Sequence, residues 1–213
     1  MKAQLKGAEV VAGLLPAGNA NDHFNDVHDN DVVQSIVDSD IRRIDLLKII
    51  TTVKGKKYQR YAHSYIGFGL TPVVGKELNR TDLNRFNEIV IVVRSLLSLH
   101  SIKIRHDNKN LRYYSLIFSN VSKMSKVLSL VKDSSNNDGR YEVTFIKRHN
   151  KIKLIRRLLK ASTAGLQGNS HGDQYTFETI KPILAQLDGE IVTIDAHSTA
   201  TIDIEHRTLS CIV

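Results

Sequence analysis

The chain has 213 residues, a formal net charge of +8 and a single cysteine, Cys211. This length is enough to bury a substantial core, and one cysteine excludes a disulfide framework, so we expect a reducing compartment, the cytoplasm. No apolar run reaches the roughly 18 residues of a membrane span, and the first segment is too charged for a secretory signal. The positive charge favours an acidic partner, and nucleic acid, nucleotide phosphate and an anionic membrane face stay open.

The first segments predict a strand, a loop and a helix. Residues 9–15, EVVAGLL, form a continuous apolar run typical of strands covered on both faces in parallel sheets. In the loop PAGNAND that follows, Asn21 or Asp22 can cap a helix whose apolar residues continue to Ile36. Such a loop points backbone N–H groups at the helix start, where an anion is favoured, so it predicts either a phosphate site or an ordinary strand-to-helix turn.

From Ile41 onward the pattern is rich in strands. IRRIDLLKIITTV and YQRYAHSYIGFG flank a basic turn at 54–57, and SIKIRHDNKNLRYYSLIFSN reads as two alternating strands about a polar turn. Residues 87–99 predict a helix, although they contain many β-branched residues. The remaining segments are a strand at RYEVTFIK, a short amphipathic helix at 151–160, and the closing strand segments YTFETIK, AQLDGEIVTI and TATIDIEHRTLSCIV.

Two turns carry acidic residues of the kind that act in acid/base catalysis or bind cations. In LDGE, Asp188 and Glu190 suit a tight hairpin, and they also suit an acid/base pair at one end of a strand. In NNDG, Asp138 can offer oxygen to a divalent cation, although most such turns bind nothing. The nine histidines lack metal-ligand spacing, and the sparse aromatic residues without tryptophan disfavour a stacking platform for single-stranded nucleic acid.

Taken in order, these segments resemble the diacylglycerol kinase catalytic family, which includes bacterial lipid kinases and their sphingosine and ceramide kinase relatives. GLLPAGNANDHFNDV is similar to the family element PxGTxNDFAR, with Asn19 where threonine is usual, and RRIDLLKI places Asp45 on the family's acidic position. The further similar segments, from about residue 9 to residue 213, are AHSYIGFGLTPVVGKELN, LIFSN, NNDGRYEVTFIKRHNKIKLIRRLLK, AQLDGEIV and ATIDIEHRTLSCIV.

The resemblance implies an α+β fold in two parts. Residues 41–213 would form the mostly antiparallel, β-sandwich-like C-terminal domain of a lipid kinase, which binds the lipid. Residues 1–40 would be a β-loop-α remnant of an α/β nucleotide-binding domain. The implied reaction is phosphoryl transfer from ATP, with Mg2+, to the hydroxyl of a lipid such as diacylglycerol.

The resemblance also implies roles for individual residues. Asp188 would be the general base, Glu190 would assist at the cation, and Asp45 would hold the catalytic Mg2+ through water. The residues implied to line the nucleotide phosphates are Gly18, Asn19 and Asn21. A structural Mg2+ site is implied at Asp138 with the carbonyls of Ser135 and Arg140.

The sequence also departs from the family pattern. The nucleotide-binding string GGDGT does not occur in it, and VSKMSKVLSLVKD replaces the family's glycine cluster and proline after the asparagine of LIFSN. We therefore expect a truncated chain with little or no kinase activity by itself, because phosphoryl transfer depends on positioning both substrates.

Two other functions stay open. One is a non-catalytic β domain whose basic surface binds anionic lipid or a partner chain, and the other is an activity like that of NAD kinase, against which the LDGE segment and the paired strands after it argue. For the kinase we expect a cytoplasmic protein that can contact an anionic membrane surface peripherally and does not bind nucleic acid. A homodimer stays open.

Overall fold

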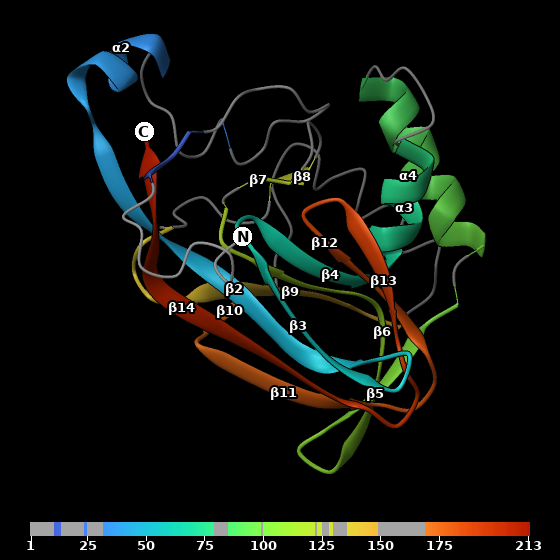
Figure 1. Ribbon diagram of the computed structural model, residues 1–213. Helices are drawn as coiled ribbons and strands as arrows, with labels where there is room; N and C mark the ends of the chain where they lie inside the picture. The colour runs from blue at the N-terminus through green and yellow to red at the C-terminus, as the bar shows by residue number, and fades with distance from the viewer. Residues whose placement is uncertain are drawn as a thin grey trace.

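A computed structural model describes residues 11–13, 24, 32–78, 85–98, 100–121, 123–124, 128–129, 136–148 and 169–213. Most of these residues belong to one large, mostly antiparallel sheet that curls over itself, with helices at its margins (Figure 1). The early strands and helices are β1 (Val11–Ala12), α2 (Val32–Asp38), β2 (Ile41–Val53), β3 (Lys56–Ala62), β4 (Tyr65–Gly69), α3 (Leu70–Leu78), α4 (Arg85–Ser98), β5 (Ile102–His106) and β6 (Lys109–Ser119). The later strands are β7 (Lys123–Met124), β8 (Leu128–Ser129), β9 (Tyr141–Lys147), β10 (Asn169–Gly172), β11 (Gln174–Thr179), β12 (Ile183–Leu187), β13 (Glu190–Ile194) and β14 (Thr199–Ile212).

The hydrogen-bonded order of the main sheet is β13-β12-β4-β6-β5-β11-β14-β2-β3, with β9 added to β6, β10 added to β9, and β1 added to β14. Three tight hairpins set the register of neighbouring strands. Their turns are Lys54–Gly55, Asp107–Asn108 and Asp188–Gly189, and both residues of each turn have positive φ. This backbone matches the twist of the flanking strands, and Gly, Asn and Asp adopt it at low cost.

The curled sheet encloses the hydrophobic core. Phe68 on β4 packs edge-on against Phe118 on β6 and against Phe177 on β11, with ring centroids 6.1 and 5.3 Å apart. Because β4 and β11 belong to opposite halves of the sheet, these contacts hold the two halves face to face. Tyr141 closes the same cluster from β9, and its hydroxyl donates to the carbonyl of Ile202 at 3.2 Å.

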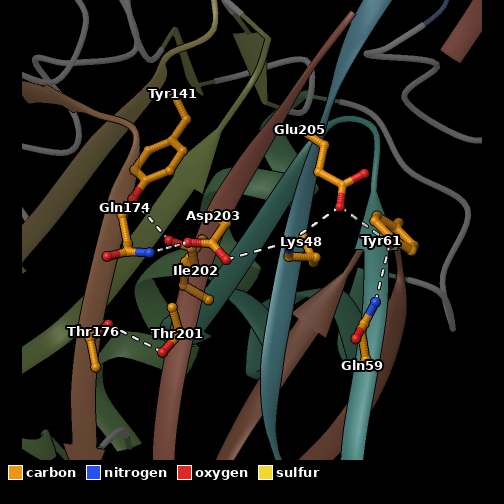
Figure 2. Close-up of polar contacts among 10 residues, drawn as sticks. All are labelled: Lys48, Gln59, Tyr61, Tyr141, Gln174, Thr176, Thr201, Ile202, Asp203 and Glu205. Carbon is orange, nitrogen blue, oxygen red and sulfur yellow. Dashed lines mark hydrogen bonds and ion pairs between the residues drawn. The ribbon is translucent and has the colours of Figure 1, made fainter. Parts of the chain in front are cut away.

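The outer face of β3, β2, β14 and β11 is polar. Lys48 on β2 lies 3.5 Å from Asp203 and 3.2 Å from Glu205, both on β14, as Figure 2 shows. We name the side chains that continue these contacts across the four strands the outer ladder: Gln59, Tyr61, Lys48, Asp203, Glu205, Gln174, Thr176 and Thr201.

Most of the predicted strands from Ile41 onward are confirmed, and so is the predicted helix over residues 87–98, which belong to α4; residue 99 lies outside the described residues. The helix α3 was not predicted. It begins directly after β4, where Gly69 has a φ of 81° and a Cβ would lie 2.4 Å from the carbonyl oxygen of Tyr114. Pro72 suits the first turn of this helix, where its missing N–H costs nothing, but Pro72 and Gly75 make the sequence read as irregular.

The segments before Ile41 match the prediction in part. Val11 and Ala12 pair in parallel with Ser210 and Cys211 of β14, but Val11 is exposed and so is not covered on both faces. The predicted helix ending near Ile36 corresponds to α2 over its last residues. The division at residue 40 stays a prediction, and the helix predicted at 151–160 lies outside the described residues. Within the described ranges, no helix is long and apolar enough to span a membrane.

Candidate functional site

Asp45 lies on the inner face of β2 and is fully buried. Its Oδ1 accepts a hydrogen bond from the N–H of Arg207 at 2.6 Å and lies 2.9 Å from Nδ1 of His206. Its Oδ2 accepts from the N–H of Gly139 at 2.7 Å. Because a buried carboxylate is costly unless such donors surround it, this arrangement fixes the loop before β9 and the bulge of β14 onto β2.

The donors to Asp45 come from irregular backbone, which sequence patterns do not reveal. Arg207 has a φ of 47° and sits where the pairing of β14 with β2 shifts register. Gly139 has a φ of 75°. Since both N–H groups point at the carboxylate, the geometry favours an anchoring role for Asp45, and its water-mediated Mg2+ role stays a prediction.

Asp188 lies in the turn between β12 and β13, and its side chain is 18% exposed. Its Oδ2 accepts from the N–H of His63 at 2.6 Å, and its Oδ1 accepts from those of Ser64 and Tyr65 at 3.0 and 3.1 Å. The His63 ring also faces it, with Nε2 at 3.5 Å from Oδ2. One carboxylate therefore holds the whole turn between β3 and β4.

The two acidic positions are connected through Asn120, which follows β6. The Asn120 N–H donates to the carbonyl of Ser64 at 2.8 Å, and its Nδ2 donates to the carbonyl of Asp45 at 3.0 Å. We name Asp45, Asn120, Ser64 and Asp188 the acidic link. Three hydrogen bonds join the main-chain carbonyl of Asp45 to the carboxylate of Asp188 through it.

The other residues with predicted site roles are not part of the acidic link. Glu190 is exposed at the start of β13. Burial raises the pKa of the Tyr58 hydroxyl on β3, Arg60 opposes this rise, and the carboxylate of Glu190 adds to it. The role of Glu190 at the cation stays a prediction.

Asp138 is exposed, and its Oδ1 accepts from the N–H of Arg140 at 3.0 Å within the same turn. The predicted residues Gly18, Asn19, Asn21 and Ser135 lie outside the described residues. In the described part of the chain, no three His, Cys, Asp or Glu side chains gather as a metal site.

Sequence patterns did not assign a role to Asn120, His63, Ser64 or His206. LIFSN ends a predicted strand in asparagine, a residue that rarely continues a strand, and this was the one local signal. The backbone contacts of Ser64 with Asp188 and Asn120 join residues more than fifty positions apart and leave no local pattern.

The fold is similar to those of solved structures described as diacylglycerol kinases. Among the similar solved structures are two from Bacillus anthracis str. Sterne, each of a protein provisionally assigned as a diacylglycerol kinase. The first has a TM-score of 0.67 and 15% identity over 99% of this chain and 71% of that chain. The second has a TM-score of 0.65 and 15% identity over 95% and 67%. A third, of a diacylglycerol kinase from the same organism, has a TM-score of 0.64 and 15% identity over 95% and 68%.

At this identity the similarity establishes the fold. No protein-family model matches the sequence, and no curated protein does.

Proposed function

We propose that this chain acts in a lipid kinase of the diacylglycerol kinase type, which transfers a phosphoryl group from ATP to a lipid hydroxyl. The observation that carries the proposal is the similarity of fold over 99% of the chain. The acidic link supports it, because it brings the two predicted aspartates into one connected region. The proposed partner is a lipid such as diacylglycerol, reached by peripheral contact of a cytoplasmic protein with an anionic membrane.

Asp188 is the proposed general base for the lipid hydroxyl. An ionised carboxylate has about four lone-pair sites, and three backbone N–H groups occupy three of them here. The group is thus fixed in place and partly exposed, and the His63 ring lies beside it. Such fixed placement suits phosphoryl transfer, in which positioning contributes most of the catalysis.

The reaction needs ATP, which such kinases use with Mg2+. Carboxylate and carbonyl oxygens suit Mg2+, and Asp138 with Arg140 offers them at the surface. Asp45 fits less well, because it is buried and N–H groups occupy both of its oxygens. We therefore assign no catalytic step to a metal-bound group.

The test is transfer of radiolabelled phosphate from ATP to a short-chain diacylglycerol in detergent micelles with Mg2+. We expect slow formation of phosphatidate, because the string GGDGT is absent from the sequence, and complete loss of it in Asp188→Asn. The matched control is Asp195→Asn. Asp195 likewise accepts two backbone N–H bonds, from Lys54 and Gly55, but it holds a different turn. Equal turnover in wild type and Asp188→Asn would contradict the role of Asp188.

The second candidate is a non-catalytic lipid-binding domain, which the missing GGDGT string and the net charge of +8 favour. Such a domain would sediment with anionic vesicles without nucleotide, would keep this binding in Asp188→Asn, and would form no phosphatidate. Rapid Mg2+-dependent turnover by the chain alone would instead contradict the expectation that the chain has little or no kinase activity by itself.

A further inference from the structure

Asn120 joins parts of the sheet that are not neighbours. β2 pairs with β3 and β14, whereas β6 pairs with β4, β5 and β9. The bond from Asn120 Nδ2 to the carbonyl of Asp45 therefore joins the end of β6 to a strand with which β6 does not pair. On its other side, the Asn120 N–H holds the carbonyl of Ser64, whose own N–H faces Asp188.

The amide of Asn120 is kept at a cost to stability. Asn120 is fully buried, and its Oδ1 has no hydrogen-bond partner among the described residues. A buried oxygen without a partner is destabilising, and an apolar side chain of similar size would avoid this cost. Such a side chain would lose the donor to Asp45, however. The need for this donor therefore explains why an amide, and not an apolar side chain, occupies this buried position.

We propose that Asn120 is a positioning residue, which sets the turn at 63–65, and with it the carboxylate of Asp188, relative to the strand of Asp45. The side chain fixes Asn120 against β2, and its N–H fixes the Ser64 peptide. Because the N–H on the other side of that peptide, which belongs to Tyr65, donates to Asp188 Oδ1, a shift of Asn120 reaches the carboxylate. The catalytic consequence rests on the proposed function, but the positioning does not.

The test follows the amide signals of His63, Ser64 and Tyr65 in proton–nitrogen NMR spectra of the full chain. Wild type is compared with Asn120→Ala, which removes the donor and leaves space, and with Asn120→Asp. The second variant keeps the size but places a carboxylate oxygen against the carbonyl of Asp45. Asn110→Ala, at an exposed position near the start of β6, the strand that precedes Asn120, is the control. If Asn120→Ala does not fold, Asn120→Asp and Asn120→Ser carry the test.

We expect the three amide signals to shift and to exchange faster in every folded Asn120 variant, and to stay unchanged in Asn110→Ala. Unchanged signals at 63–65 in a folded Asn120 variant would overturn the proposal. A purely structural role would lower the melting temperature without this local change.

The kinetic arm separates the two proposals. Asn120→Ala should lower kcat up to about 100-fold with little change in the KM for ATP. Shifted amides together with equal turnover in wild type and Asp188→Asn would sink the proposed role of Asp188 in the kinase and leave the positioning role supported. Unchanged amides in an active enzyme would sink the positioning role and leave the kinase intact.

Discussion

The acidic link and the outer ladder both join strands through polar groups, but they satisfy their charges differently. In the acidic link, the aspartate carboxylates accept from backbone N–H groups whose positions the fold fixes. In the outer ladder, flexible side chains such as Lys48 and Glu205 meet each other at the solvent boundary (Figure 2). When an acceptor is removed, backbone donors stay in place without a partner, whereas exposed side chains can hydrogen-bond to water. Removing one side chain should therefore lower the free energy of unfolding much more in the acidic link than in the outer ladder.

The largest effect is expected for Asp45→Ala. It leaves the N–H groups of Gly139 and Arg207 without an acceptor in a buried place, so the free energy of unfolding should fall by about 3–5 kcal/mol. Urea denaturation measures this loss, with Asp45→Asn as a milder variant and the exposed Asp138→Ala as the control. A loss under about 1 kcal/mol would mean that the buried carboxylate of Asp45 stabilises the fold little more than a charged group on the surface does.

Asp188→Ala comes next. It removes the acceptor of three backbone N–H groups that lie near the surface, and we expect a loss of about 1.5–3 kcal/mol. Asp195→Ala removes the same kind of contact from the turn at 54–55, where solvent is closer, and should cost about 1 kcal/mol. If both variants lose the same stability in thermal unfolding, burial does not distinguish the two turns.

Alkaline titration extends the comparison to the core. Burial raises the pKa of the Tyr141 hydroxyl above its ordinary 10.0, with the charges of Asp173 and Asp203 adding to it. The unfolded chain releases this proton near pH 10 while the folded chain keeps it, so stability should fall as pH rises above 10. Tyr141→Phe should flatten this fall, at a loss of about 1 kcal/mol near neutral pH for the bond to Ile202. Circular dichroism measures the stability, and tyrosinate absorbance follows the release of the proton. An equally steep fall of stability above pH 10 in Tyr141→Phe would contradict the prediction.

Lys48→Met should have the smallest effect. Burial opposes the shift, but the hydrogen bond and charge of Glu205, together with Asp203, raise the pKa of Lys48 above 10.5. The pair therefore stabilises the fold below about pH 10.5, and this contribution disappears as pH rises through the folded pKa. We expect a loss under about 1 kcal/mol that shrinks in high salt, and an even smaller one for the exposed Lys109→Met. A larger loss that does not depend on salt would place Lys48 with the buried groups.

Local patterns predicted the hairpins because their determinants are local. Lys54–Gly55, Asp107–Asn108 and Asp188–Gly189 carry the turn residues themselves, and alternating strands flank them. The helix α3 was not predicted because Pro72 and Gly75 interrupt the helical spacing of its apolar residues.

The site could be predicted only as separate pieces. Asp45 and Asp188 stood out by motif and by resemblance, but what connects them is the Ser64 peptide and the amide of Asn120. Backbone hydrogen bonds of this kind depend on the tertiary fold and not on side-chain identity, so Ser64 carries no signature of its role in the sequence. The sequence does not predict the bulge at Arg207 either, because the positive φ of this residue goes together with the hydrogen bond from its N–H to Asp45, a contact of the tertiary fold.

The most direct test of the connected acidic link is a double-mutant cycle of Asp45→Asn and Asp188→Asn, measured as free energies of unfolding in urea. Contacts within one hydrogen-bond network couple by about 0.5–3 kcal/mol, and distant sites add within about 0.5 kcal/mol. We predict coupling of at least about 0.5 kcal/mol for this pair, and additivity for Asp45→Asn with Asp195→Asn, which holds the turn at the far end of β2. Additive losses for Asp45 and Asp188 would show that the two aspartates stabilise their turns independently.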